Sequence, residues 1–344
     1  MPPTITMVKA MSDKILLAHG SGGKLAHDII RQSLLPALSN PILARLDDAA
    51  VLETAGRLAF TTDSYVIQPI FFPGGDIGKL AVCGTVNDLA MVGATPHYLS
   101  LAFIIEEGLP LSDLQKVVSS IKDTAAMADV AVVAGDTKVV NRGNADKLFI
   151  NTAGIGTVPE GVNISGHNAR PGDILILSGT VGDHGIAVLS QREGLSFATE
   201  LESDCAPLNG LVAEMLAASH NIHCLRDPTR GGLATTLNEI AGQSGVSIRI
   251  YEDKIPIREE VSSACEMLGL DPLYVANEGK LIAAVDRDEA DNILEKMKKH
   301  PYGHDAAVIG EVKEENPGKV VMKTGLGTTR IIDMLVGEPL PRIC

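Results

Sequence analysis

The sequence predicts a mixed α/β (α+β) protein built from two domains. Three observations lead to this fold class: a length of 344 residues, alternating strand-like and helix-like segments in both halves, and a break near the middle that is rich in Gly, Asn and Pro. A domain usually runs to ~100–200 residues, so this length suits two domains. We expect an N-terminal α/β domain over residues 1–160, a linker over 161–173 and a C-terminal α+β domain over 174–336.

Strands and helices alternate in the N-terminal half. The segment 24–38 carries apolar residues at helical spacing, and a glycine turn at 19–23 precedes it. The run 130–134 (VAVVA) is short and apolar, which is typical of a buried strand. The expected strands are 58–62, 97–105, 130–134 and 148–158, and the expected helices are 24–38, 78–92 and 112–127.

The pattern restarts after residues 161–173 (GVNISGHNARPGD), which show little apolar periodicity and therefore mark the linker. The expected strands beyond it are 174–177, 246–250, 280–285, 306–312 and 319–322, and the expected helices are 185–192, 208–218, 233–241, 258–268 and 288–299. Both halves thus combine strands with helices.

Composition excludes two classes of partner. The formal charge is −14 and aromatic residues make up 3%, with no Trp, so the chain offers neither a basic surface nor stacking platforms for nucleic acid. No apolar run approaches the ~20 residues of a membrane span, and residues 1–14 lack the apolar region of a signal peptide. We expect a cytoplasmic protein that binds neither nucleic acid nor membranes.

The five cysteines form no C-x-x-C pair, so neither a disulfide framework nor a zinc site is indicated. Four of them are best interpreted as small core residues or incidental thiols: Cys83, Cys205, Cys224 and Cys265. The fifth, Cys344, is the last residue of the sequence.

Acidic residues recur where strands are expected to end. They are Asp48, Asp63, Asp88, Asp136 and Asp227. Each alone could serve as a cap or turn residue. Carboxylates that converge on one cleft would repel each other unless hard cations neutralised them, and Mg²⁺ commonly bridges carboxylates to substrate phosphates. The set therefore indicates a Mg–nucleotide site.

Two glycine-rich turns, each expected to open a helix, could bind phosphate through backbone N–H groups. The first is His19–Gly23, which includes Gly22 and Gly23, and the second is Asp227–Gly232. Neither has the spacing of a Walker A loop. A structural turn is an equally good interpretation of either one alone.

Lys138 and Glu278 are the best candidates for acid–base chemistry. Lys138 lies two residues beyond Asp136, and Glu278 lies in ANEGK just before an expected strand, where a carboxylate has no capping role. The alternative for each is a solvated loop charge.

Residues 337–344 (GEPLPRIC) are expected to form a flexible tail that carries Cys344. Two prolines hold the segment extended, and eight residues at ~3.3 Å each reach ~25 Å. That length suits a swinging arm for a reactive thiol. The adjacent carboxylate should raise the pKa of the thiol, with Arg342 partly offsetting it. An unremarkable last residue is the alternative.

These motifs together resemble the HypE family of hydrogenase maturation factors, within the aminoimidazole ribonucleotide synthetase (PurM-like) superfamily. The resemblance runs through HGSGGK, TTDS, GTVNDLAM, AGDTKVV, SGTVGDHG, RDPTRGG, ANEGK and the final PRIC. It implies a homodimer whose N-terminal strands pair into a barrel-like sheet. It also implies ATP and Mg²⁺ held by acidic residues matching Asp48, Asp63, Asp88 and Asp136.

The implied reaction is part of cyanide-ligand synthesis for NiFe hydrogenase. A carbamoyltransferase, HypF, loads a carbamoyl group onto the cysteine matching Cys344; the family enzyme dehydrates it to a thiocyanate; and the cyano group passes to iron on a HypC–HypD complex. Positions matching Glu278 and Lys138 would act as base and as proton relay or charge stabiliser.

Two other functions remain open from the sequence. One is another ATP-dependent enzyme of the superfamily, such as a selenophosphate synthetase or a thiamine-monophosphate kinase. The run 11–23 lacks the cysteine that selenophosphate synthetases typically place there. The other is a non-enzymatic scaffold with a cysteine tail, for which the acidic cluster would have no purpose.

Overall fold

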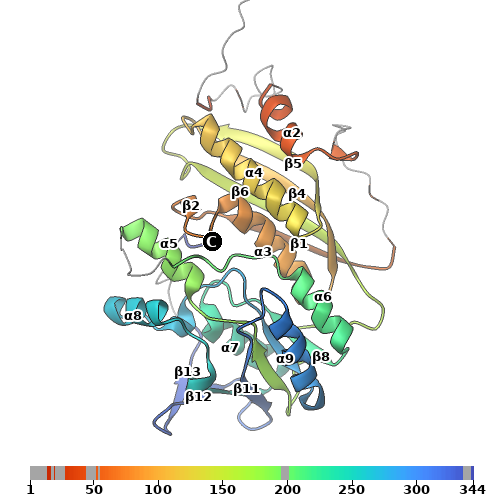
Figure 1. Cartoon of the computed structure of the whole chain (residues 1–344), viewed down its shortest axis with the longest axis vertical. Helices are drawn as coiled ribbons and strands as arrows, with labels where there is room; N and C mark the ends of the chain where they lie inside the picture. Colours follow the sequence, from red (N-terminus) through yellow and green to blue (C-terminus); the bar gives the residue numbers. More distant parts are fainter. Residues whose placement is uncertain are drawn as a thin grey trace, which may run out of the picture.

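The computed structural model describes residues 14–16, 19, 28–43, 52, 55–194, 201–335 and 342–344. Gly22, Gly23 and Asp48 lie outside the described residues. Figure 1 shows two layered units, one above the other, with the C-terminal residue between them.

The N-terminal unit is a four-stranded sheet in the order β1-β6-β4-β5. Strands β1 and β4 are antiparallel to β6, and β4 and β5 run parallel. Helices α3 and α4 pack together, and α3 covers β1 and β6. The elements are η2 (Ile30–Leu34), α2 (Leu35–Leu38), β1 (Arg57–Tyr65), β2 (Phe71–Phe72), β3 (Gly75–Asp76), α3 (Ile77–Met91), β4 (Thr95–Glu106), α4 (Leu111–Met127), β5 (Ala131–Val140) and β6 (Leu148–Val158).

Helix α3 is buried around nearly its whole circumference, because it lies between the sheet, α4 and the C-terminal unit. Asp76 caps it: the carboxylate accepts the main-chain N–H groups of Gly78 at 2.7 Å and Lys79 at 3.1 Å. This cap orients the helix that carries Asp88.

The two faces of the N-terminal sheet differ. Along β6 buried residues alternate with half-buried ones, so one face packs against the helices and the other is more open. On the open face Phe60 pairs with Ile155, which pairs with Tyr98. Phe60 is 70% exposed. Among the described residues this apolar row is only partly covered, since Ile155 and Tyr98 are half-buried.

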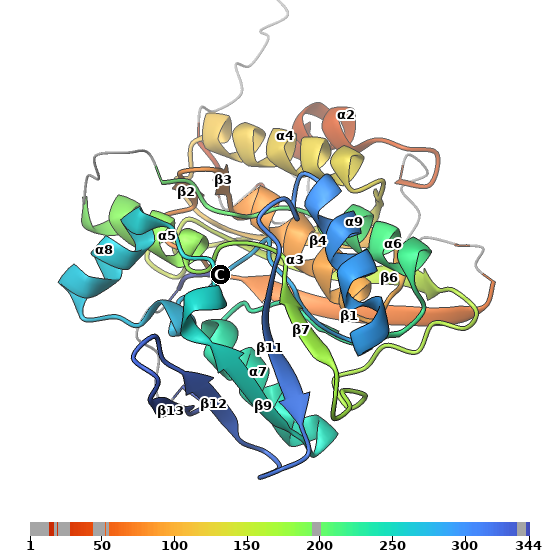
Figure 2. The same cartoon turned by 60° about the horizontal axis from the view of Figure 1, so that its bottom comes forward.

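The C-terminal unit is a seven-stranded sheet in the order β13-β12-β9-β11-β7-β10-β8. Residues of β7 alternate between two cores: Leu175 and Leu177 lie in one with α7, and Ile176 lies in the other with α6 and α9. Figure 2 shows α7 beside β9 and β12. The elements are β7 (Ile174–Leu177), α5 (Asp183–Glu193), α6 (Asn209–Ala218), β8 (Ile222–Arg226), α7 (Gly232–Ser244), β9 (Ser247–Tyr251), η4 (Glu252–Lys254), α8 (Glu259–Leu268), η5 (Pro272–Tyr274), β10 (Ile282–Val285), η6 (Arg287–Glu289), α9 (Ala290–Lys299), β11 (Ala307–Lys313), β12 (Val320–Lys323) and β13 (Thr329–Ile332).

The predicted mixed α/β fold class is confirmed, with local corrections. Strands β2, β3, β8 and β13 were not expected. Strand β5 was expected to end at residue 134, but pairing with β4 carries it to Val140, so Asp136 and Lys138 lie within a strand. Asp63 likewise lies inside β1 rather than after it, and Asp88 lies in helix α3 rather than at the end of a strand. The apolar core of a strand is shorter than its hydrogen-bonded length.

Within the described ranges, no helix combines the length and the apolarity that a membrane span requires. The four cysteines expected in the core are buried and free: Cys83, Cys205, Cys224 and Cys265.

Candidate active site

A polar cavity of about 160 Å³ lies where the two units meet. It brings together Asp63, Asp88, Asp227, Glu278 and Cys344, which are far apart in the sequence. The other lining residues are Ser64, Tyr65, Gly84, Thr229 and Arg230.

The N-terminal unit supplies two carboxylates to this cavity. Asp63 stands near the end of β1 and Asp88 in the last turn of α3. The Thr61 hydroxyl donates a 2.8 Å hydrogen bond to Asp88 and joins the strand to the helix. Burial raises the pKa of Asp88, and the neighbouring Asp63 charge adds to the rise.

The loop that leads from β8 into α7 supplies Asp227, Thr229 and Arg230. It ends in a tight turn at Gly232, whose φ is +62° and where a Cβ would come within 2.5 Å of the Leu273 carbonyl oxygen. Asn277 fixes the loop, since its amide donates to the Pro228 carbonyl at 2.9 Å. The glycine turn therefore presents these three residues next to Glu278.

Glu278 is held from both sides of the interface. Its main-chain N–H donates to Asp204 at 3.0 Å, and Asn87 of α3 donates to its carbonyl oxygen at 3.4 Å. The side chain is buried, and its Oε1 has no hydrogen-bond partner. Burial raises the pKa of Glu278 well above the usual range, and nearby Cys205 and Asp227 add to the rise. This is the pattern expected of a functional carboxylate.

The carboxylates repel one another. Burial raises the pKa of Asp227 to about 7, and the charge of Asp88 contributes next. Among the described residues, no three His, Cys, Asp or Glu side chains converge tightly enough to hold a metal ion alone. A pair of crowded carboxylates still fits Mg²⁺, which is usually bound by one or two carboxylates together with substrate phosphates and waters.

Cys344 reaches the cavity because the preceding residues are bound beside it. The Val66 N–H donates to the Cys344 carbonyl oxygen at 3.3 Å, and the Gln68 N–H donates to that of Arg342 at 3.2 Å. Ile343 is 1% exposed. Residues 337–341 of the predicted flexible tail lie outside the described residues.

The thiol of Cys344 is poorly acidic in this position. Burial raises its pKa to about 12, and Glu278 adds to the rise. Arg230 opposes it and donates to Sγ at 3.2 Å. The expectation that Arg342 offsets the rise is wrong, because Arg342 turns away and pairs with Asp146 at 2.5 Å.

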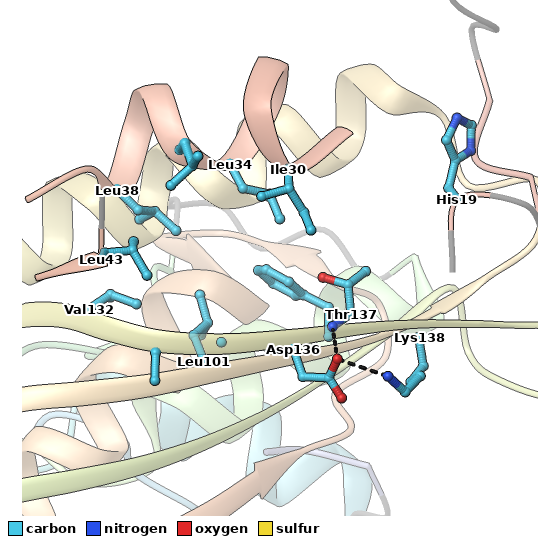
Figure 3. Close-up of a pocket in the computed structure, with 14 residues that line it drawn as sticks. His19, Ile30, Leu34, Leu38, Leu43, Leu101, Val132, Asp136, Thr137 and Lys138 are labelled. Carbon is cyan, nitrogen blue, oxygen red and sulfur yellow. Dashed lines mark hydrogen bonds and ion pairs between the residues drawn. The ribbon is translucent and has the colours of Figure 1, made fainter. Parts of the chain in front are cut away.

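Asp136 and Lys138 do not line this cavity. They lie on β5, form an ion pair at 2.9 Å and border a second cavity of about 260 Å³ beneath η2 and α2. In Figure 3 both side chains point away from the helices. Asp136 pairs with Ala102, Ala102 with Asn151, and Asn151 with Ser64. Asp136 is thus level with Ser64 but on the opposite edge of the sheet, three strand spacings or ~14 Å away.

Sequence reasoning missed three polar residues around Cys344. Arg230 contacts the thiol, and His184 and Arg192 of α5 contact the chain before it. Arg230 and His184 lie inside RDPTRGG and SGTVGDHG, so these motifs contained a usable signal. Arg192 had none.

Comparison with known proteins identifies the family of this chain. Two family models match: AIR synthase related protein, N-terminal domain, over residues 46–158, and its C-terminal domain over residues 170–323. A carbamoyl dehydratase HypE of Azotobacter vinelandii is 54% identical over 329 residues, which cover 95% of this chain and 96% of that protein.

Solved structures match as well. A hydrogenase maturation protein HypE in complex with ATP superposes with a TM-score of 0.93 at 52% identity, covering 96% of this chain and 99% of that one. A chain from a HypE–HypF complex gives 0.79 at 53% identity, covering 89% and 99%. The chain belongs to the HypE family of carbamoyl dehydratases, within the AIR synthase related proteins.

Proposed function

We propose that this chain uses ATP to dehydrate a carbamoyl group on Cys344 to a thiocyanate, which supplies a cyanide ligand in NiFe-hydrogenase maturation. One observation carries the proposal: the Cys344 thiol lies in the same cavity as Glu278 and three carboxylates suited to a Mg–nucleotide. Membership of the carbamoyl dehydratase family supports it.

The chemistry explains why such a cavity is needed. Oxide is a very poor leaving group, so the carbamoyl oxygen must first receive the γ-phosphoryl group of ATP. The C–O bond then breaks, phosphate leaves, and the nitrogen gives up both protons. The net reaction converts S-carbamoyl-cysteine and ATP into S-cyano-cysteine, ADP, phosphate and one proton.

Asp63 and Asp88 would hold Mg²⁺ on the N-terminal side, and Asp227 faces them from the C-terminal loop. Bound Mg²⁺ would neutralise phosphate oxygens and relieve the carboxylate repulsion that, after burial, raises the pKa of Asp88 and Asp227. Asp48, Gly22 and Gly23 are proposed to complete the nucleotide site.

Glu278 is proposed as the proton acceptor. Its raised pKa makes the ionised carboxylate a stronger base than an ordinary glutamate, and its free Oε1 can accept a proton from the carbamoyl nitrogen. Arg230, already bonded to Sγ, can stabilise negative charge on the reacting group.

The direct test uses protein in which Cys344 has been carbamoylated chemically with cyanate. The C-terminal peptide should lose the mass of one water when Mg–ATP is added, and Cys344→Ala should show no adduct. A water loss that needs no ATP, or an adduct on another cysteine, would contradict the proposal.

Lys138 and Asp136 are proposed to act from a second copy of the chain. On one chain they lie on the edge of the sheet opposite Asp63, with their side chains on the open face (Figure 3). A homodimer that covers the apolar row of Phe60, Ile155 and Tyr98 would bring the partner's open face to this site.

Mixed dimers test this arrangement. Lys138→Ala and Glu278→Gln chains are each expected to be inactive alone. After the two are mixed, mixed dimers should recover part of the activity, because one site then holds both intact residues. Inactive mixed dimers would place Lys138 and Glu278 on the same chain.

The remaining expectations are proposals of the same kind. HypF is proposed as the carbamoyl donor enzyme, which agrees with the solved HypE–HypF complex, and HypC–HypD as the acceptor. Residues 1–160 and 174–336 are proposed as the domains, with 161–173 as linker; β6 ends at Val158 and β7 begins at Ile174. Consumption of ATP favours a cytoplasmic location.

A further inference from the structure

The last three residues are held through their main chain and through the buried side chain of Ile343. Three carbonyl groups, those of Arg342, Ile343 and Cys344, accept hydrogen bonds from the rest of the protein. The donors are the N–H groups of residues 66 and 68, His184 and Arg192, and we call these groups the tail dock.

The main-chain part of the tail dock has the form of strand pairing. The Val66 N–H donates to the Cys344 carbonyl, and the Gln68 N–H donates to the Arg342 carbonyl. Donors two residues apart on one segment therefore face acceptors two residues apart on the other, and the two segments run in opposite directions, as in an antiparallel pair of strands. Residues 66–68 directly follow β1, which carries Asp63. Adding an extended peptide to this segment therefore places the peptide's last side chain in the cavity.

Helix α5 supplies the two side-chain donors. His184 and Arg192 are eight residues apart, about two turns, and so lie on one side of the helix. His184 Nε2 donates to the Ile343 carbonyl at 2.7 Å, while Nδ1 accepts from the Ser203 hydroxyl at 2.8 Å. Arg192 donates to the carbonyls of Arg342 at 2.7 Å and Gln68 at 2.6 Å.

Of the three docked residues, Ile343 is the one whose side chain the protein can recognise by burial. Ile343 is fully buried in the hydrophobic cluster that includes Tyr65, Ile67 and Ile186. The side chain of Arg342, by contrast, is about half exposed and pairs with Asp146 at the surface. The tail dock therefore selects an apolar residue just before the cysteine and an extended backbone.

We propose that the tail dock is a peptide-binding site that also works in trans, so that protein without its own last three residues dehydrates a separate S-carbamoylated peptide ending in Ile-Cys. The proposal rests on the proposed function. The contacts described above involve only residues 342–344, and none requires that these residues be joined to the rest of the chain. The covalent link supplies only a high effective concentration.

The reaction in trans has the same balance as in cis. The carbamoyl oxygen of the peptide takes the γ-phosphoryl group of ATP, the C–O bond breaks with loss of phosphate, and the nitrogen loses two protons to form the peptide thiocyanate. No other reactant is needed.

The test uses protein that lacks residues 342–344 and the peptide GEPLPRIC, S-carbamoylated with cyanate. Circular dichroism and ATP binding first establish that the shortened protein is folded. With Mg–ATP, the peptide should lose the mass of one water. A full-length Ile343→Asp/Cys344→Ala variant, whose tail cannot fill the tail dock, provides the same test should the shortened protein not fold.

Two peptide variants probe specificity. Replacing the isoleucine with aspartate should weaken binding at least tenfold, because a buried apolar side chain is replaced by a charge. Replacing the arginine with alanine should change binding by a few-fold at most, since its ion pair is exposed. Equal binding of the aspartate peptide would overturn the assignment of the tail dock.

Full-length protein carbamoylated on its own Cys344 is run in parallel. Dehydration by this protein but not of the peptide, even at millimolar peptide, would overturn the inference and leave the proposed function standing. Dehydration by neither would overturn the proposed function, and the inference with it. Dehydration of both supports the tail dock as a separate peptide site.

Discussion

Ile343→Ala should release Cys344 from the cavity without unfolding the protein. Ile343 is 1% exposed and is the only side chain of the last three residues that is fully buried. The change leaves the carbonyl groups of residues 342–344 and their hydrogen bonds available. Its main effect is therefore on the equilibrium between bound and released tail.

The size of the effect follows from the burial. Truncating a buried isoleucine to alanine costs ~2–5 kcal/mol. The lower value applies here, because release of the tail avoids the cost of keeping the cavity that the shorter side chain would leave. At ~1.4 kcal/mol per factor of ten, ~2 kcal/mol increases the ratio of released to bound tail about 30-fold.

Alkylation of Cys344 measures that ratio. In the cavity the thiol has a pKa of about 12 and is almost entirely protonated at pH 8, whereas a free cysteine has a pKa of ~8.5 and reacts as thiolate. Iodoacetamide therefore modifies the released tail. The rate at Cys344, followed by mass spectrometry, should rise by up to about 30-fold in Ile343→Ala.

Leu326→Ala is the matched control, because Leu326 is 94% exposed and its truncation should alter neither the rate nor the melting temperature. An unchanged rate in Ile343→Ala would refute the argument that burial of this side chain holds the thiol in the cavity. A large fall in melting temperature would refute the claim that the tail leaves without unfolding.

Four further outcomes are expected. Glu278→Gln keeps shape but loses basicity, so it should bind ATP normally while single-turnover dehydration falls ~10²–10⁴-fold; a loss of only a few-fold would exclude Glu278 as the base. Asp88→Asn should weaken Mg–ATP binding in calorimetry and keep the Thr61 hydrogen bond, and unchanged affinity would remove Asp88 from the site. Asp76→Ala removes the cap of α3 and should lower the free energy of unfolding by ~0.5–2 kcal/mol in denaturant titrations. Deprotonation of Cys344 favours release, since its pKa is about 12 when bound and ~8.5 when free. Binding of the tail should accordingly be complete below about pH 8.5 and weaken as the pH rises toward 12. Protection of the C-terminal peptide that did not change with pH over that range would contradict this.

Much of the fold was predictable from local patterns. Helix α4 and strand β6 each present one buried and one more open face, so the spacing of their apolar residues in the sequence predicts the element. Strands β8 and β13 were not expected. Both are short strands at the edges of the C-terminal sheet, and their pairing partners, not their own residues, make them strands.

The candidate site divides in the same way. The sequence by itself determined which residues were candidates for the proposed chemistry, because Asp63, Asp88, Asp227 and Glu278 lie in short motifs whose residue types suit Mg–ATP and proton transfer. Tertiary structure alone decided that these four meet Cys344 in one cavity and that Asp136 and Lys138 lie at the far edge of the sheet. It alone also decided that Arg230, rather than Arg342, faces the thiol. The physical reason is that distances between residues remote in the chain depend on sheet order and on the packing of one unit against the other, which no local pattern records.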